Sequence, residues 1–357
     1  MEMTRIVITG GPCAGKSTAM SWIQNTFTQM GYTVLFVPET ATELITGGVA
    51  PWTCGSNIAY QTCQFRLQLA KEEVFRQAAE TMDVPKVLIV CDRGALDNKA
   101  YMTGEEFAQV LAGLGTNEIE LRDNYDAVFH LVTAAKGAEE FYTTANNTAR
   151  RETPEEAAAL DDKLISAWTG HPHLRVIGND CGFEEKINRV LKEIAHVLGV
   201  PQPIEIERKY LVELTGEIPN SNVSEIKQTY LLPIDGQERR LRMRGENGHN
   251  VYFLTTKIRL AADRSYEHEC QISENRYLEL LREANPAKRT VVKHRTCFLW
   301  KDQYFELDEF LEPKLDHLML EIEDAEDEAS VKFPPFLRVI KDVTGDAAYY
   351  NSNIAKI

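Results

Sequence analysis

The residues between Gly10 and Thr18, with the sequence GGPCAGKST, have the types and spacing of a phosphate-binding loop. Four of them, Gly10, Gly15, Lys16 and Ser17, match the pattern G-x-x-x-x-G-K-[ST]. In such a loop backbone N–H groups surround phosphate oxygens, and the following helix N-terminus favours negative charge. Lys16 would contact the β- and γ-phosphates, and the Ser17 hydroxyl would bind Mg²⁺. We therefore predict a nucleoside-triphosphate site, for ATP or GTP, formed by Gly10, Gly11, Gly15, Lys16, Ser17 and Thr18.

The segments on either side of this loop support the same prediction. Residues 4–9 are a β-branched run typical of a short buried strand, and residues 19–23 begin an apolar helical pattern. A chance match in a glycine-rich turn would not be expected to have this strand–loop–helix order. The order therefore favours a nucleotide site.

A carboxylate and an arginine follow the apolar run 87–91. Asp92 has the position of a Walker B carboxylate, which holds Mg²⁺ directly or through water; the alternative is an Asp that caps the next helix. Motor-type ATPases usually carry a catalytic Glu at the next position, where this chain has Arg93. With Glu39 at the end of the strand-like run 32–37, the Asp-Arg pair resembles nucleoside and nucleotide kinases. That resemblance implies Glu39 as a base or metal-shell group and Arg93 as a contact to the transferring phosphate.

Two further arginines, Arg150 and Arg151, lie where those kinases place a lid over the phosphates, although a solvated basic turn is an equally good explanation. Most of residues 3–200 also resembles the AAA-like P-loop family. The resemblance rests on the phosphate-binding loop, CDRG at 91–94, ARRE at 149–152, W-x-GHP at 168–172 and Asn179.

The second half of the chain alternates charged and apolar residues with a period of two. The first strand-like segment places Glu205, Glu207 and Lys209 on one face. Half-exposed strands commonly have one solvated polar face, but seven such segments with charges of one sign are hard to explain in that way. Closing the strands into a barrel would bring acidic and basic residues together in a lumen. The later segments contribute Arg240, Arg242 and Arg244; Lys257; Glu267 and Glu269; Lys293 and Arg295; Glu306 and Asp308; and Glu321 and Glu323.

The E-x-E-x-K opening at 205–209 resembles the CYTH family, the triphosphate tunnel metalloenzymes that include class-four adenylyl cyclases and thiamine triphosphatases. The likeness covers about residues 203–355 and includes the later E-x-E segments, K-x-R at 293–295, VTGD at 343–346 and YYN at 349–351. It implies an eight-stranded antiparallel tunnel with Glu205, Glu207 and Lys209 at its reaction centre. The implied ligands of Mg²⁺ or Mn²⁺ are Glu205, Glu207, Glu267, Glu269, Glu306, Asp308, Glu321 and Glu323. The implied ligands of a triphosphate are Lys209, Arg242, Arg244, Lys257, Lys293 and Arg295.

The elements that must position these residues divide the chain into two predicted domains. Strand-like runs at 4–9, 32–37, 87–91, 127–132 and 174–177 alternate with helical patterns, including a charged segment at 136–170, which predicts a parallel α/β sheet over residues 1–200. Pro201-Gln202-Pro203 has the composition of a linker. Residues 203–357 then form the predicted antiparallel eight-stranded β-barrel.

Composition narrows the classes of partner and compartment. A chain of 357 residues holds about two domains, and its net charge of −15 argues against nucleic acid as the main partner. The seven cysteines are dispersed without a C-x-x-C pair, which favours reduced thiols and a cytoplasmic protein. We expect no transmembrane segment, since no apolar run is long enough, and no signal or transit peptide, since the first strand begins almost at Met1.

Three functions fit these features. The first is an Mg²⁺-dependent enzyme acting on phosphoanhydrides, by NTP or tripolyphosphate hydrolysis or by phosphoryl transfer, with cyclase chemistry as a variant. The second is a GTP- or ATP-dependent regulator whose tunnel binds polyphosphate or acidic phospholipid headgroups without hydrolysis; the domain order resembles that of a eukaryotic trafficking factor associated with GTP and acidic phospholipids. The third, an inert assembly protein, is disfavoured by the intact set at 205–209.

Overall fold

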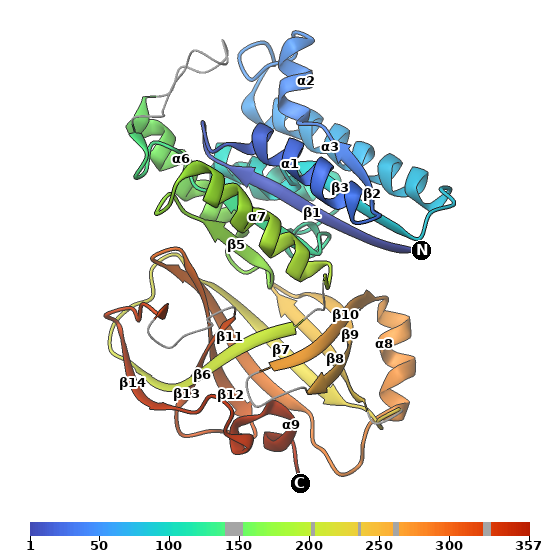
Figure 1. The fold of residues 1–357 in the computed structure, drawn as a ribbon, viewed down its shortest axis with the longest axis vertical. Helices are drawn as coiled ribbons and strands as arrows, with labels where there is room; N and C mark the ends of the chain where they lie inside the picture. The colour runs from blue at the N-terminus through green and yellow to red at the C-terminus, as the bar shows by residue number, and fades with distance from the viewer. Residues whose placement is uncertain (140–152, 201–203, 235–236, 260–263, 324–329) are drawn as a thin grey trace. The chain divides into compact units, whose positions relative to one another are not determined.

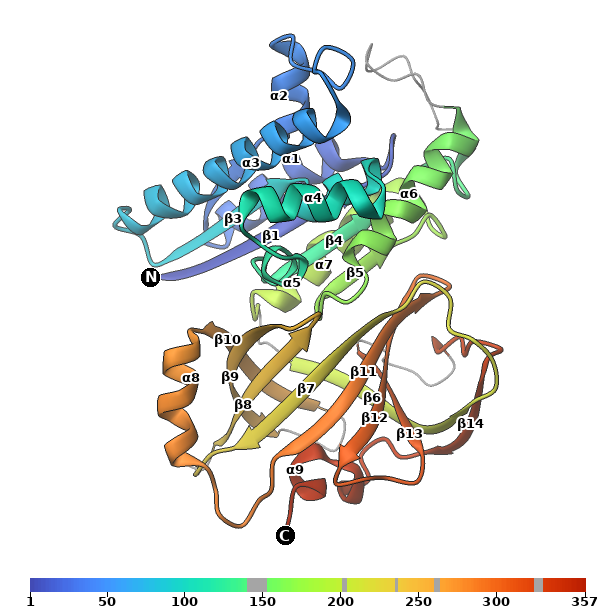
Figure 2. The same ribbon diagram turned by 180° about the vertical axis from the view of Figure 1, so that it is seen from behind.

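The computed structural model describes residues 1–139, 153–200, 204–234, 237–259, 264–323 and 330–357, with side chains at 204–206, 258–259 and 264–268 outside the description. These residues form two compact units, Met1–Ala195 and His196–Ile357. Each unit has its own sheet, and Figures 1 and 2 show the two sheets from opposite sides. Among the described residues, no helix is long and apolar enough to cross a membrane.

The first unit is built on a five-stranded parallel sheet, as the alternating pattern predicted. The runs Ile6–Ile8 and Val87–Cys91 are almost completely buried, because each lies in a strand with neighbours on both sides. The strands have the order β2-β3-β1-β4-β5, with β1 Glu2–Gly10, β2 Thr33–Val37, β3 Lys86–Asp92, β4 Ala127–Leu131 and β5 Leu174–Ile177.

Helices cover both faces of this sheet. In Figure 1, α1 and α7 lie in front of it, and in Figure 2, α4 and α5 do. The sequence patterns predicted no helix between residues 95 and 122, where the structure has η1, α4 and α5. The bounds are α1 Lys16–Gln29, α2 Thr40–Thr46, α3 Asn57–Glu80, η1 Ala95–Tyr101, α4 Gly104–Leu114, α5 Glu118–Arg122, α6 Pro154–Trp168 and α7 Phe183–Val197.

The second unit is an antiparallel sheet that closes on itself, which confirms the predicted eight-stranded barrel. Its order is β10-β9-β8-β7-β11-β12-β13-β6-β14, and β10 also pairs with β6 through Ser265 and Glu205. The closed ring therefore has eight strands, and β14 is a ninth that pairs with β6. The bounds are β6 Ile204–Leu214, β7 Asn222–Tyr230, β8 Glu238–Glu246, β9 His249–Arg259, β10 Arg264–Ile272, β11 Val291–Trp300, β12 Gln303–Glu312, β13 Leu318–Glu323 and β14 Leu337–Asp342, with the helices α8 Glu274–Leu280, η3 Leu281–Glu283, η5 Ala347–Tyr349 and α9 Asn351–Ile354.

The two faces of the ring differ in chemistry. Tyr210, Phe298 and Phe305 belong to an apolar cluster against which Phe333 and Phe336 pack, after the end of β13. The residues that alternate with these carry the charges. Lys209 opposes Glu321 across β6 and β13, and Arg295 opposes Asp308 across β11 and β12.

An apolar layer borders the charged face at one end. It contains Val291, Phe310 and Met319, which lie two residues along their strands from Lys293, Asp308 and Glu321 respectively. Ala355 belongs to the same cluster, so the C-terminal segment packs on this layer.

Candidate functional site

The phosphate-binding loop connects β1 to α1 with three residues in the left-handed half of backbone space. Gly10, Cys13 and Gly15 have φ values of 146°, 58° and 92°. A Cβ atom on Gly10 would lie 2.1 Å from the carbonyl oxygen of Leu131, so no other residue fits there without a shift of the backbone. Gly15 is the N-cap of α1 and offers no side-chain cap. The first N–H groups of α1 are therefore not satisfied by an N-cap side chain, as a phosphate-binding helix terminus requires.

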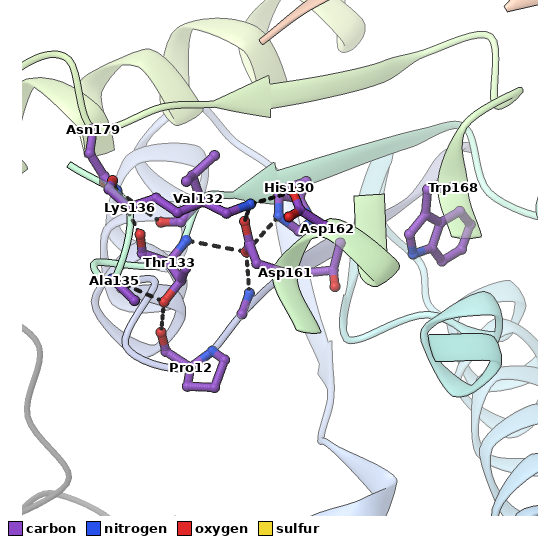
Figure 3. Close-up of polar contacts among 12 residues, drawn as sticks. Pro12, His130, Val132, Thr133, Ala135, Lys136, Asp161, Asp162, Trp168 and Asn179 are labelled. Atoms are coloured by element: carbon purple, nitrogen blue, oxygen red, sulfur yellow. Dashed lines mark hydrogen bonds and ion pairs between the residues drawn. The ribbon is translucent and has the colours of Figure 1, made fainter. Parts of the chain in front are cut away.

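A buried carboxylate on α6 holds the other end of this loop, as Figure 3 shows. Asp161 Oδ1 accepts hydrogen bonds from the backbone N–H of Gly11 at 2.9 Å and of Thr133 at 3.2 Å. His130 Nε2 lies 2.9 Å from the same oxygen, and Lys136 Nζ lies 3.0 Å from Oδ2. Burial raises the pKa of Asp161, but the bond to His130 and the charge of Lys136 outweigh it and lower the pKa to about 2. Asp161 is therefore a charged brace for the loop.

The predicted residues Lys16, Glu39, Asp92 and Arg93 lie together at the carboxyl ends of β1, β2 and β3. Arg93 Nε donates to Glu39 Oε1 at 2.7 Å, and Arg93 has a φ of 70°, which is uncommon for a residue other than glycine. Burial and then the charge of Arg93 lower the pKa of Lys16 to about 8, against the attraction of Asp92 and Glu39. Burial raises the pKa of Glu39, but Arg93 and Lys16 outweigh it and bring the pKa to about 2.

The structure adds Asp97, which the sequence analysis did not select. Its Oδ2 accepts from Thr9 Oγ1 at 2.7 Å and lies 3.5 Å from Arg93 Nη1. Its Oδ1 accepts from the indole N–H of Trp168 at 2.6 Å. Asp97 and Glu39 thus both pair with Arg93, and Asp97 also anchors the end of α6 to the same site.

The donor set of this site fits Mg²⁺. Asp92 Oδ1 is buried and has no hydrogen-bond partner in the described part of the chain, and burial raises the pKa of Asp92. Such a carboxylate oxygen is a ligand that Mg²⁺ prefers, directly or through water. Ser17 and Thr18 are exposed in the first turn of α1, where a hydroxyl is accessible to a bound ion.

In the second unit the charged residues form one buried network. Lys209 Nζ lies 2.7 Å from Glu207 Oε1 and also donates to Glu321 Oε1. Lys293, which is 1% exposed, donates to Asp308. The charge of Glu321 is favoured by Lys209, Lys293 and Arg295, which outweigh its burial and hold its pKa well below the ordinary value.

Arg295 is the centre of this network. Its guanidinium makes two bonds of 2.7 Å to the two carboxylate oxygens of Asp308. It also donates to Glu321 Oε2 at 2.7 Å and to Glu306. A guanidinium suits such a position because its donors are fixed in a planar fork. Four strands, β6, β11, β12 and β13, therefore contribute to a single cluster.

The opposite side of the ring carries further basic residues. Arg242 on β8 lies 3.3 Å from Glu269 on β10, and Glu269 also accepts from Thr255 Oγ1 at 2.6 Å. Arg244 is buried two residues from Arg242, and Lys257 of β9 is paired in register with Glu238 of β8 and Glu267 of β10. The predicted triphosphate ligands thus come from the adjacent strands β8 and β9 and from β6 and β11 of the closed ring.

One carboxylate has a strongly altered acidity. Burial and the nearby charges of Glu323, Glu321 and Asp308 raise the pKa of Glu306 to about 7, although Arg295 opposes this. Repulsion among carboxylates is the chemistry that a cation relieves. Among the residues the structure describes, however, no group of three or more His, Cys, Asp or Glu side chains could by itself hold a metal ion.

Several predicted site residues lie outside the part of the chain that the structure describes. Arg150 and Arg151 fall in the segment 140–152, so the lid prediction is not addressed. Glu205 and Glu267 lie in β6 and β10, but their side chains are outside the described part.

Two family models match this chain, one in each half. Residues 5–186 match the family described as AAA domain, and residues 203–333 match the CYTH domain. The chain belongs to the AAA-domain P-loop family and carries a CYTH domain behind it.

The CYTH domain is similar to curated proteins named inorganic triphosphatase. That of Nitrosomonas europaea is 32% identical over 154 residues, which are 42% of this chain and 96% of that protein. That of Acetivibrio thermocellus is 31% identical over 156 residues, 43% of this chain and 93% of that protein. A solved inorganic triphosphatase is 31% identical with a TM-score of 0.32, covering 42% of this chain and 93% of that one.

The residue spacing in α6 could have indicated from the sequence that Asp161 is buried. Ala157, Asp161, Leu164 and Trp168 follow the spacing of one buried helical face, and all four are buried in α6. A carboxylate on an apolar helical face needs partners, because an unpaired buried charge is costly. Asp97 has no comparable signal, since it lies in a short 3₁₀ helix.

Proposed function

We propose that the CYTH domain hydrolyses inorganic triphosphate or a related triphosphate compound, and that the P-loop domain binds ATP or GTP with Mg²⁺. The observation that carries the first part is the buried network in which Lys209, Lys293 and Arg295 meet carboxylates of two other strands, β12 and β13. Similarity to proteins named inorganic triphosphatase supports the same reaction.

In this proposal the basic residues of the ring bind the phosphates. Arginine and lysine make charge-assisted bonds to phosphate oxygens, and Arg242 of β8 and Lys293 and Arg295 of β11 are held on two different strands. The side chains of Val291, Phe310 and Met319 in the apolar layer have no donors for a polyanion, so the triphosphate would bind away from them. The carboxylate of Glu207, which is 29% exposed, is better placed than the fully buried Asp308 to meet an incoming ligand.

Mg²⁺ or Mn²⁺ bound by the acidic set, with Glu205, Glu207 and Glu306 as candidate ligands, would neutralise phosphate charge and activate water. The raised pKa of Glu306 supports a need for positive charge there. The described carboxylates alone do not complete such a site, so we assign the remaining ligand to Glu205 or Glu267.

The proposal is tested by measuring phosphate release by the purified chain in the presence of Mg²⁺ or Mn²⁺. The compounds offered are tripolyphosphate, ATP, GTP and thiamine triphosphate. We expect release from at least one of them, and a strong loss in Glu207→Gln without loss of the fold. Lys227→Ala is the control, because Lys227 is an exposed β7 residue paired only with Glu225 among the contacts described. No release from any of these compounds would overturn the hydrolase. Tight binding of tripolyphosphate without release would favour the regulator that binds polyphosphate or phospholipid headgroups.

Phosphoryl transfer is a second candidate for the P-loop domain. Buried polar atoms without hydrogen-bond partners in the described part of the chain include Thr40 Oγ1 and Gln61 Oε1. Thr40 follows Glu39 directly, and Gln61 lies on α3, on the same helical face as Gln68, which donates to the Arg93 carbonyl at 3.3 Å. Unsatisfied buried polar atoms are costly, so these favour a polar acceptor molecule beside the Glu39–Arg93 pair.

A further inference from the structure

Phe183 is a large apolar residue that is 51% exposed at the phosphate-binding loop. A Cβ atom on Gly15 would lie only 2.6 Å from Cε2 of the Phe183 ring. The ring therefore packs directly on the backbone of Gly15, the residue before Lys16, while half of its surface remains in solvent. Gly15 permits this contact because it has no side chain.

The segment before Phe183 is held firmly by hydrogen bonds. Asn179 Nδ2 donates to the carbonyl oxygens of Thr133 and Lys136, both at 2.8 Å, as Figure 3 shows in part. The buried Lys186 donates to Asn179 Oδ1 and to the Val132 carbonyl, both at 2.7 Å. Arg189 pairs with Asp180 at 2.7 Å. These bonds fix the β5–α7 connection, so Phe183 is presented in a defined position.

The sheet order indicates which end of a nucleotide would meet this ring. Asp92 ends β3 and Glu39 follows β2, and both strands lie on one side of β1. Phe183 follows β5, which lies on the other side, beyond β4. A nucleotide whose γ-phosphate lies toward Lys16 and Asp92 would extend its nucleoside toward β4 and β5. The ring therefore lies on the nucleoside side of the loop.

We propose that Phe183 is a stacking platform for the base of the nucleoside triphosphate, an inference that rests on nucleotide binding at the P-loop. An aromatic ring stacks on the face of any base, because every base has a π-face. The ring has no hydrogen-bonding group, so it supplies affinity without choosing between adenine and guanine. The base covers the exposed half of the ring, and the ring in turn shields the loop backbone at Gly15.

The proposal is tested by calorimetric titration of the full chain with ATP, GTP and ribose 5-triphosphate. The last of these has no base. Binding that persists in Lys16→Ala is assigned to the CYTH domain and subtracted. We expect Phe183→Leu to weaken the binding of ATP and GTP by about 5- to 100-fold, which is the effect of losing one stacking contact. The affinity for ribose 5-triphosphate should not change. Phe183→Tyr should restore both nucleotides. Val74→Ala, at a residue of α3 that is 60% exposed, is the control and should change nothing.

Three outcomes would count against the platform. Equal weakening of all three ligands by Phe183→Leu would mean that the ring only shapes the loop. If Phe183→Leu binds ATP and GTP as the wild type does, while Lys16→Ala has lost this binding, Phe183 is not a stacking platform. The P-loop would remain the nucleotide site. Wild-type binding in Lys16→Ala would instead overturn nucleotide binding at the P-loop, and the platform with it.

Discussion

Asp161 accepts a 2.9 Å hydrogen bond from the backbone N–H of Gly11, which joins α6 to the phosphate-binding loop across 150 residues of sequence. A Cβ atom on Gly11 would lie 2.8 Å from the same oxygen, so a larger residue would break the contact. Because Asp161 also bonds His130, Thr133 and Lys136, the loop, β4 and α6 share one buried carboxylate. The shape of the loop thus depends on an element far from it in sequence.

Replacing Asp161 with Ala should destabilise the P-loop domain and weaken its nucleotide affinity. The change leaves the N–H groups of Gly11 and Thr133 without their acceptor and Lys136 with Asp162 alone, and breaking a buried charged pair costs about 3 kcal/mol. Urea unfolding and nucleotide titration of the same protein measure the two effects. Asp161→Asn keeps an oxygen for the Gly11 N–H and should retain more affinity than Asp161→Ala. Equal affinity in the wild type and Asp161→Ala would show that the loop keeps its shape without the brace.

Asp92→Asn should reduce Mg²⁺-dependent nucleotide binding more than it reduces stability. Its Oδ1 has no protein partner to lose in the described part of the chain, whereas an amide is a much poorer ligand for Mg²⁺ than a carboxylate. Nucleotide titrations with Mg²⁺ and with EDTA separate the two effects. If the metal dependence is the same in both proteins, Asp92 serves only as a helix cap.

Glu39→Gln should abolish phosphoryl transfer to a small acceptor and leave NTP binding nearly intact. The Glu39 carboxylate is charged and paired with Arg93, so the amide would remove a base while keeping the shape of the side chain. A radiolabelled γ-phosphate, followed into a panel of hydroxyl-bearing acceptors, measures the transfer. Transfer at the wild-type rate in Glu39→Gln would exclude the base. Slow hydrolysis with no transfer in the wild type would favour a nucleotide switch.

The strands of the P-loop domain could be predicted because their apolar runs are short, unbroken and bounded by turns. The strand predicted at 87–91, for example, is observed as Lys86–Asp92. The helices α4 and α5 were missed, although Thr103 and Glu106 form a capping box at the start of α4. That signal is in the sequence and was not used.

In the CYTH domain the charge alternation predicted strands but not their neighbours. The closure of the ring through β10 and β6 depends on pairing across about 60 residues, which a period of two does not encode. The strands β7 and β14 do not carry two charges of one sign at alternating positions, so the pattern did not reveal them. The ion pairs were also not predictable, because the choice between a metal and an arginine as the partner of Glu306 depends on register.

The raised pKa of Glu306 should make the stability of the CYTH domain depend measurably on pH. Its pKa is raised from 4.5 to about 7 in the folded chain, mainly by burial and then by the charges of Glu323, Glu321 and Asp308, against the pull of Arg295. Between these two values the folded protein keeps a proton that the unfolded protein has released. The free energy of unfolding should therefore fall as the pH rises from 4.5 to 7, by an amount on the order of 2 kcal/mol.

Urea unfolding of the wild type and Glu306→Gln in EDTA, at intervals between pH 4.5 and 8, measures this contribution. The glutamine cannot ionise, so the stability difference between the two proteins should shift in favour of Glu306→Gln as the pH rises. Glu39 and Asp161, whose pKa values are lowered to about 2, change the stability below this range, and the comparison at each pH cancels the groups common to both proteins. Adding Mg²⁺ should flatten the wild-type slope if the cation binds beside Glu306, because positive charge lowers the pKa of the carboxyl. A stability difference that is constant across the range would mean that Glu306 is already ionised at pH 4.5, held so by Arg295.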